Sequence, residues 1–591
     1  MLADFTQQLT PAGGIAGSTL LALVPVFSLL ALLALLRVTA WLAVVLGSIV
    51  TFVLALAVWD VPTGDAVRSY VYGAATGLWA VDWIVFWGVV IFNTLVVTGA
   101  FDRLKDWLIA QATRDIRIQT ILLAWAFGAL LEGLVGFGFP WAVVAPILIS
   151  LGVVELEALR VGALGNTAPV SFGALGAPIL GLAKVTKLDL MDLSSAIGRL
   201  VAVLALFPPL MLIFLVSGWR GVKTGWPLAV AGSFGYIAGQ YPIAEFVGPY
   251  LPDIVGSLTA FAATFLLISV WRPKDILGFG GVPLAPSEAV PAEAPVAARV
   301  PGAPHEPGRV PAPEPGEAGA PVAPTPAPSR PAYGGAFGGT VRDALLGVTP
   351  FLILIAVVVA WTGPWSKHYP PHATFKGDVI TKWTVYTKSV TGTSASGSSI
   401  DATFGWNPLV AGTAIFFSWL LILLFLRPRT RQFPQIFRRT FGQIWGALVV
   451  GFFIFGLAFL FNFAGMAASM ANGFSKVGTS YIILAPILGW IGVALSGSNT
   501  STNTIFGFFQ LQVGKLLNAP LLIFPVLNSI GAEIGKPVAP QTASVGVSTT
   551  GYVRKEGEVI RHNLVWTLVI LLYLIGVGAF FYFVIPSAMR P

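Results

Sequence analysis

The chain has 591 residues, of which 56% are hydrophobic and only 10% are charged. With a mean hydropathy of +0.82, it is too apolar for a soluble enzyme of this length, and the composition predicts an all-α polytopic membrane protein. The net charge of +8 does not indicate nucleic-acid binding, because the basic residues lie largely in short loops between apolar spans, where they set membrane topology.

Cysteine is absent, which excludes disulfides, thiolate metal sites and cysteine nucleophiles. The four histidines, His305, His368, His372 and His562, fall in predicted loops or polar segments. A histidine proton relay inside the membrane is therefore not expected, nor is a metal site or another cofactor.

The first half of the chain, residues 1–272, begins with apolar runs that are long enough to cross a bilayer, at about 18–36 and 79–100. These are the first and the third predicted spans, and basic residues follow both of them. The positive-inside rule therefore places both of the following loops in the cytoplasm and the N-terminus outside. Residues 118–153 are predicted to form two limbs around the turn LEGLVGFGFP, and each limb is too short to span the bilayer. We interpret them as a re-entrant hairpin that enters from the cytoplasm.

A linker and a second half follow. Residues 273–340 are predicted to be a disordered cytoplasmic linker, because Pro, Ala, Glu and Gly dominate them. The second half, residues 341–591, contains a polar external loop at 363–405. Its own hairpin, residues 478–517 around SGSNTSTN, enters from the outside by the loop charges.

Each hairpin is followed by a predicted span that is interrupted by polar residues, Gly and Pro. The two interruptions are NTAPVSFGALGAP, Asn166 to Pro178, and NSIGAEIGKPVAP, Asn528 to Pro540, with the same spacing in both. Backbone that leaves the helix in lipid survives only where it is buried in protein or lines a wet cavity. Paired breaks in two halves of opposite orientation predict inverted-topology repeats with a binding site between them, although Gly and Pro also kink packed helices without function.

Three charged residues lie in these motifs. Glu132 is on the first hairpin tip, where a carboxyl group is costly unless it is paired, hydrated or protonated. It is therefore a candidate for proton coupling, and capping of the hairpin amides is the structural alternative. Glu533 and Lys536 have i, i+3 spacing, which predicts an ion pair on one helical face. Protonation of Glu533 would free Lys536 for an anion, whereas a static pair would only stabilise the break.

Neutral hydrogen-bonding residues complete the candidate substrate site. Half-helix N-termini beside them would attract a small anion, and the same hydroxyls and carbonyls could coordinate sodium. These candidates are Asn166, Thr167, Ser171, Ser498, Asn499, Thr500, Asn503, Asn528, Ser529 and Gln541.

The motifs EGLVGFGFP, GNTAPVSFGALGAP, SGSNTSTNTIFG and NSIGAEIGKPVAPQ, followed by KEG at 555–557, resemble the L-lactate permease family. The resemblance implies a bacterial inner-membrane transporter that imports lactate and related 2-hydroxy acids such as glycolate together with protons. It also implies an elevator-type division into a scaffold and a moving transport domain. A homo-oligomer is compatible with the sequence, and the linker and the 363–405 loop depart from the family pattern.

For such a substrate, Lys536 and the amides around Ser498–Thr500 are expected to face the carboxylate, and Asn166, Thr167 or Asn528 the hydroxyl group. A sodium-coupled carboxylate transporter is the alternative. An enzyme is not expected, because the sequence has no HExxH motif, and no GxxxxGK[ST] motif indicates transport driven by hydrolysis.

Overall fold

A computed structural model describes residues 5–36, 38–111, 114–284, 341–363, 365, 392–393, 399–400, 404 and 408–591. Most of the predicted linker and of the predicted external loop lies outside the described residues. The same is true of His305, His368 and His372.

The described part of the chain is built from helices, with three very short strands. The helices of the first half are α1 (Ile15–Ala34), α2 (Ala40–Ala57), α3 (Thr63–Gly77), α4 (Trp83–Val97), α5 (Ala100–Gln111), α6 (Ile116–Gln119), α7 (Gly128–Leu134), α8 (Phe139–Ser150), α9 (Glu155–Leu164), α10 (Gly173–Thr186), α11 (Leu190–Leu204), α12 (Pro208–Phe246) and α13 (Pro252–Val270). Those of the second half are α14 (Val341–Thr362), α16 (Ala411–Leu426), α17 (Gln432–Ala464), α18 (Met466–Phe474), α19 (Tyr481–Ser496), α20 (Asn499–Leu516), α21 (Ile523–Gly535), α22 (Pro540–Val547) and α23 (Glu556–Phe583).

Shorter elements join these helices. Two are π-helical, η1 (Leu78–Asp82) and η2 (Thr120–Phe127), and the 3-10 turns are η3 (Val170–Phe172), η4 (Phe279–Gly281), η6 (Ser475–Ser480), η7 (Lys536–Val538) and η8 (Pro586–Met589). The strands are β1 (Phe5–Thr6), β2 (Gly392–Thr393) and β3 (Ser399–Ile400). β1 pairs in parallel with β2, and β2 pairs antiparallel with β3.

Among the described residues, ten helical segments are long and apolar enough to cross a membrane. This confirms the prediction of an all-α polytopic membrane protein. One span is longer than predicted: α3, η1 and α4 form one helical segment over Thr63–Val97, of which the sequence indicated only the second part. The sequence missed α3 because Asp65 and Arg68 make its first turns polar. Helix α17 is also longer than one bilayer crossing requires, since it covers Gln432–Ala464.

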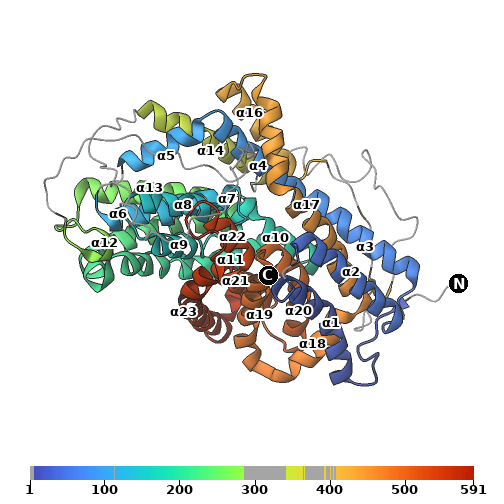
Figure 1. Ribbon diagram of the computed structural model, residues 1–591. Coiled ribbons are helices and arrows are strands. Elements are labelled where there is room, and N and C mark those ends of the chain that lie inside the picture. Colours follow the sequence, from blue (N-terminus) through green and yellow to red (C-terminus); the bar gives the residue numbers. More distant parts are fainter. Residues whose placement is uncertain are drawn as a thin grey trace, which may run out of the picture.

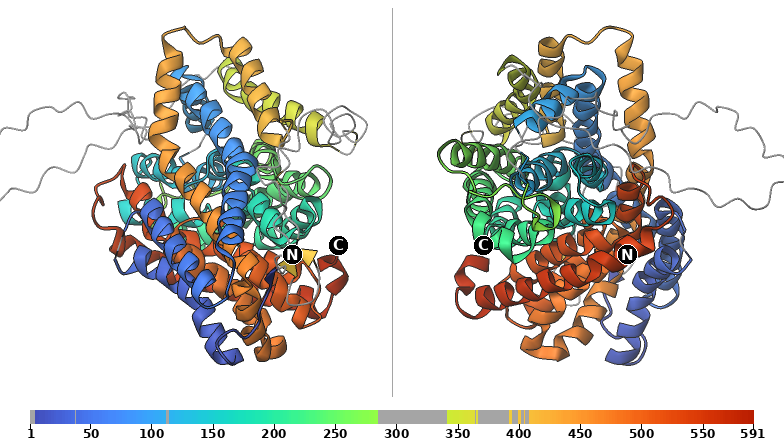
Figure 2. Two further views of the ribbon diagram at one scale, coloured as in Figure 1. Left: turned by 90° about the vertical axis from the view of Figure 1, so that its right-hand side faces the viewer. Right: turned by 60° about the vertical axis from the view of Figure 1, so that its left-hand side comes forward.

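The centre of the molecule combines both halves of the chain. Helices α8 to α10 of the first half pack against α20 to α22 of the second (Figure 1). The segment Ile116–Leu134, which leads into the first hairpin tip, is entirely buried; at 19 residues it is long enough to cross a membrane, so this limb is longer than predicted. Further out, α3 and α17 run side by side (Figure 2). The helices that carry the motifs are therefore enclosed by the rest of the fold.

Both predicted interruptions contain a real break in the helix. In the first, α9 ends at Leu164 and α10 begins at Gly173. In the second, α21 ends at Gly535, and the turn η7 and the extended residue Ala539 separate it from α22. Proline favours such ends because it has no backbone N–H to continue the helical ladder. The breaks leave backbone and side-chain polar groups free for other partners in the protein interior.

Candidate functional site

A buried ion pair joins the two halves of the chain. Lys536, the first residue of η7, places Nζ 2.5 Å from Oε1 of Glu132 on α7. Nδ2 of Asn166, in the first break, donates to the other oxygen of Glu132 at 2.8 Å. Glu132 is 2% exposed and Lys536 is 6% exposed. Both oxygens of the Glu132 carboxylate are thus bonded by side chains that come from the two breaks.

This arrangement corrects the predicted pairing of Lys536 with Glu533. The i, i+3 rule holds along a continuous α-helix, but α21 ends at Gly535, between these two residues. Lys536 lies on the 3-10 turn beyond that end, and its ion-pair partner is Glu132. The alternative role that we considered for Glu132, capping of the hairpin amides, is likewise replaced by bonds to Asn166 and Lys536.

The first break lies close against Glu132 because residue 173 is a glycine. A Cβ atom at Gly173 would lie 2.5 Å from Oε1 of Glu132. The next three residues, Ala174, Leu175 and Gly176, have positive φ values of 45°, 57° and 76°. Left-handed backbone at two residues other than glycine is costly, and it occurs preferentially at functional sites.

Glu533 contacts the first break instead of Lys536. Its Oε1 accepts a hydrogen bond from the backbone N–H of Ser171 at 2.8 Å. The other oxygen, Oε2, is buried and has no hydrogen-bond partner in the described part of the chain. Glu533 itself is fully buried. It therefore has an acceptor atom that could bind a proton or a donor from outside the protein.

A network of neutral side chains extends from this point into the second hairpin. The hydroxyl oxygens of Ser171 and Ser529 are 2.9 Å apart. Asn503 on α20 donates to Ser529 at 2.9 Å and to the carbonyl oxygen of Pro178 at 3.1 Å. Nδ2 of Asn528 donates to Oδ1 of Asn503 at 3.0 Å. Because these groups form hydrogen bonds with one another, the network connects the two breaks and the second hairpin.

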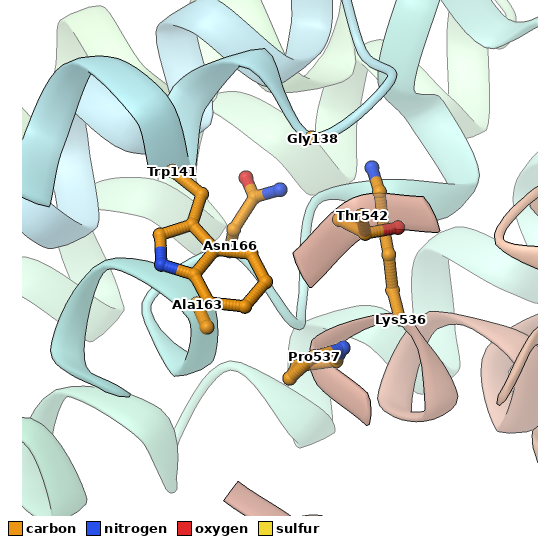
Figure 3. A pocket seen from close by; sticks show the side chains of 7 residues that line it. All are labelled: Gly138, Trp141, Ala163, Asn166, Lys536, Pro537 and Thr542. Atoms are coloured by element: carbon orange, nitrogen blue, oxygen red, sulfur yellow. The ribbon is translucent and has the colours of Figure 1, made fainter. Parts of the chain in front are cut away.

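A small cavity lies beside the ion pair (Figure 3). In the figure, the amide of Asn166 lies between the ring of Trp141 and the side chain of Lys536. The cavity is about large enough for one water molecule. It is lined by Gly138, Trp141, Ala163, Asn166, Lys536, Pro537 and Thr542. Oδ1 of Asn166 is buried there and has no hydrogen-bond partner among the described residues.

The remaining candidates from the sequence lie outside this cavity. The hydroxyl of Thr167 donates to the carbonyl of Leu164 at 2.8 Å, a local bond. Ser498 caps α20 by accepting from the N–H of Ser501. The side chain of Asn499 is buried without a hydrogen-bond partner in the described chain. The tip residues Ser498 to Thr500 do not line the cavity with Lys536.

Gln541 is exposed, although its neighbour Thr542 lines the cavity. A Cβ atom at Gly497 would lie 2.9 Å from Cβ of Gln541. Likewise, a Cβ atom at Gly138 would lie 2.6 Å from the methyl group of Thr542. Both hairpin tips therefore meet the start of α22 at adjacent residues.

Sequence reasoning missed a buried acid near the site. Asp253 on α13 is 1% exposed and accepts a hydrogen bond from the hydroxyl of Tyr236 at 2.7 Å. It lies next to the first hairpin, since a Cβ atom at Gly133 would be 2.7 Å from Cβ of Asp253. The signal was present, because an acid in an otherwise apolar stretch is a functional candidate. The cavity residues Trp141 and Thr542 gave no comparable signal.

Within the described residues, no group of three or more His, Cys, Asp and Glu side chains is placed to hold a metal ion.

The segments that form this site also match known proteins. Residues 18–291 and 337–585 match the family described as L-lactate permease. The glycolate permease GlcA of Escherichia coli K12 is 30% identical over 575 residues, which cover 96% of each chain. The L-lactate permease of the same strain is 28% identical over 584 residues, 95% of this chain and 96% of the relative. That of Bacillus subtilis strain 168 is 29% identical over 583 residues, 96% of this chain and 97% of the relative.

Among solved structures, MtrF of Neisseria gonorrhoeae, described as one of a class of antimetabolite efflux pumps, aligns with 92% of this chain and 85% of its own. The identity is 13% and the TM-score is 0.39, too low to establish a shared fold.

Proposed function

This chain belongs to the L-lactate permease family, and we propose that it imports lactate and related 2-hydroxy acids such as glycolate by proton symport across the bacterial inner membrane. Its family and its relatives are permeases, so the protein is a multi-pass membrane transporter of a small monocarboxylate rather than an enzyme. The choice among lactate, glycolate and their analogues, and the coupling to protons, are parts of the proposal.

The observation that carries the proposal is the buried Lys536 beside a cavity. A carboxylate in a low-dielectric site needs a cationic partner, and charge-assisted hydrogen bonds are among the strongest in proteins. In this structure Glu132 provides the carboxylate that Lys536 requires. The substrate carboxylate takes the place of Glu132 at Lys536, and the free Oδ1 of Asn166 accepts the hydrogen bond of the substrate hydroxyl. Because the cavity is so small, substrate entry requires the ion pair to separate.

Charge balance then explains the coupling to a proton. The ion pair of Lys536 and Glu132 is neutral as a whole, so a substrate anion would leave one uncompensated negative charge in a buried site. Such a charge is costly in a membrane protein. One proton bound by Glu132 restores neutrality and releases Lys536 to the substrate. Each anion therefore enters with one proton, and transport is electroneutral. Glu533 is a second proton-binding candidate, since one of its oxygens has no partner among the described residues.

We also propose that the two halves are inverted-topology repeats, and that the hairpins and broken helices move as a unit. The repeated spacing of the two breaks and the ion pair between the halves support this idea. Helix α1 packs against α19 of the second hairpin, outside the proposed unit. Because the chain has no cysteine, a single engineered disulfide between α1 and α19 can be tested without background. Oxidation should stop transport and reduction should restore it; full transport by the oxidised protein would contradict the moving unit.

The anion site is tested by Lys536→Met, which keeps much of the stem and removes the charge. Loss of a charge-assisted bond should weaken lactate binding about 10- to 150-fold. Lys515→Met is the matched control, because Lys515 is exposed in the last turn of α20. Folded Lys536→Met protein that binds lactate with unchanged affinity would show that the lysine only pairs with Glu132.

Coupling is tested by uptake of labelled lactate into proteoliposomes under an imposed pH gradient and, separately, a sodium gradient. We expect the pH gradient alone to drive accumulation. Acceleration by sodium alone would favour a sodium-coupled carrier. Glu132→Gln should abolish accumulation driven by the pH gradient while exchange of labelled for unlabelled lactate continues. Competition by glycolate, D-lactate, pyruvate and acetate would then define the substrate range.

A further inference from the structure

The lining of the cavity beside Lys536 is chemically divided. Lys536, Asn166 and Thr542 provide polar groups, whereas the carbon atoms of Trp141 and Ala163 provide an apolar wall. Figure 3 shows the indole nitrogen on the side of the ring away from Lys536. A 2-hydroxy acid has the same division, because its carboxylate and hydroxyl groups are polar and the remaining group on C2 is hydrogen or alkyl. If the polar groups of the substrate face Lys536 and Asn166, that third group faces the wall.

Packing against α22 fixes the position of Trp141. The indole is 1% exposed, and a Cβ atom at Gly546 on α22 would lie 2.4 Å from a ring carbon. The ring belongs to a separate apolar cluster at the junction of α8, α9, α22 and α23. The members of this cluster are Trp141, Ala145, Leu159, Ala163, Ala543, Val547 and Val559. A close-packed wall of this kind cannot retreat to accept a larger group.

We propose that Trp141 and Ala163 are specificity-determining residues that limit the group on C2 of the substrate to hydrogen or methyl. This inference rests on the proposed function, in which Lys536 binds the carboxylate. It assigns the two residues a role in selecting short 2-hydroxy acids, and it gives Gly546 the role of making room for the ring. An apolar pocket distinguishes substrates that differ by one methylene by roughly 10- to 200-fold, which is enough for such a selection.

The test measures competition for uptake of labelled glycolate by unlabelled lactate and 2-hydroxybutanoate. Ala163→Val adds bulk to the wall and should weaken competition by lactate about tenfold, with little effect on glycolate itself. Trp141→Leu removes bulk and should strengthen competition by 2-hydroxybutanoate about tenfold. Ala163→Gly should act in the same direction as Trp141→Leu, with a smaller effect.

Two control variants separate a size filter from general disturbance. Ala158→Val adds the same bulk at a fully buried position of the same helix, outside the cavity lining. Trp219→Leu removes an indole that is 68% exposed. Both should leave competition by lactate and by 2-hydroxybutanoate unchanged. Size-exclusion profiles in detergent establish that each variant is folded.

The size filter would be overturned if competition by lactate were unchanged in folded Ala163→Val protein and competition by 2-hydroxybutanoate were unchanged in folded Trp141→Leu protein. That result is distinguishable from a failure of the proposed function, because Lys536→Met reports on the anion site independently. If Lys536→Met loses lactate binding and the wall variants do not change competition by lactate or by 2-hydroxybutanoate, only the filter is wrong. If Lys536→Met binds lactate normally, the anion site itself is wrong, and the filter fails with it.

Discussion

The two broken helices have the same residue spacing but leave the helix in different ways. The first is open from Gly165 to Phe172 apart from the short turn η3, and the left-handed residues Ala174 to Gly176 extend the break into the start of α10. The second is interrupted only by η7 and one extended residue. As a result, Asn166 lies in the open segment beside the cavity, whereas its counterpart Asn528 remains inside α21.

This difference shows that a repeated motif can supply different chemistry at its two copies. The first break contributes neutral groups, the amide of Asn166 and the N–H of Ser171, and both bind carboxylates of the site. The second break contributes the cation, Lys536. Neither break forms the site alone, because the carboxylate of Glu132 needs partners from both.

The largest effect is expected for the ion pair that bridges the breaks. Glu132→Gln leaves Lys536 buried without its carboxylate, which should lower the free energy of unfolding by about 3 to 5 kcal/mol. The double variant Glu132→Gln/Lys536→Met should regain much of this loss, because no unpaired charge remains. Denaturation of the purified protein in detergent measures Glu132→Gln, Lys536→Met and the double variant. Additive losses in the double variant would mean that the two side chains do not interact.

An intermediate effect is expected when a methyl group is added at equivalent glycines of the two breaks. Gly173→Ala places Cβ against Oε1 of Glu132, and Gly535→Ala places it 2.5 Å from the carbonyl oxygen of Trp490. Each substitution should lower the free energy of unfolding by about 1 to 3 kcal/mol. Only Gly173→Ala should also weaken lactate binding, because only this residue contacts the ion pair. Isothermal titration of both variants decides the point, and an equal loss of affinity in both would contradict the division of roles.

The smallest effect is expected for the two matched asparagines. Asn166→Ala removes a hydrogen bond to Glu132 and a group in the cavity lining, so lactate binding should weaken about fivefold. Asn528→Ala removes its bond to Asn503 in the neutral network and should mainly lower the free energy of unfolding, by about 1 kcal/mol. Binding and unfolding are measured on the same preparations. If Asn528→Ala weakened binding more than Asn166→Ala did, the second break would have to contact the substrate through its helix.

The sequence by itself determined the membrane class, the family and the location of both breaks. These features are local: length and apolarity decide whether a helix can span a bilayer, and Gly and Pro decide where the backbone leaves it. Glu132, Asn166 and Lys536 were recognised for the same reason, since polar residues are rare in apolar segments and therefore visible.

Only the tertiary structure decided how these residues pair. The spacing of Glu533 and Lys536 predicted an ion pair, but the helix ends between them, and a residue 404 positions away in the chain provides the carboxylate. The cavity wall was equally hidden, because Trp141 and Ala163 are ordinary residues of apolar helices. Their role follows from the packing of α8 and α9 against α22. Contacts between distant segments depend on how whole helices pack together, and no pattern within one segment encodes them.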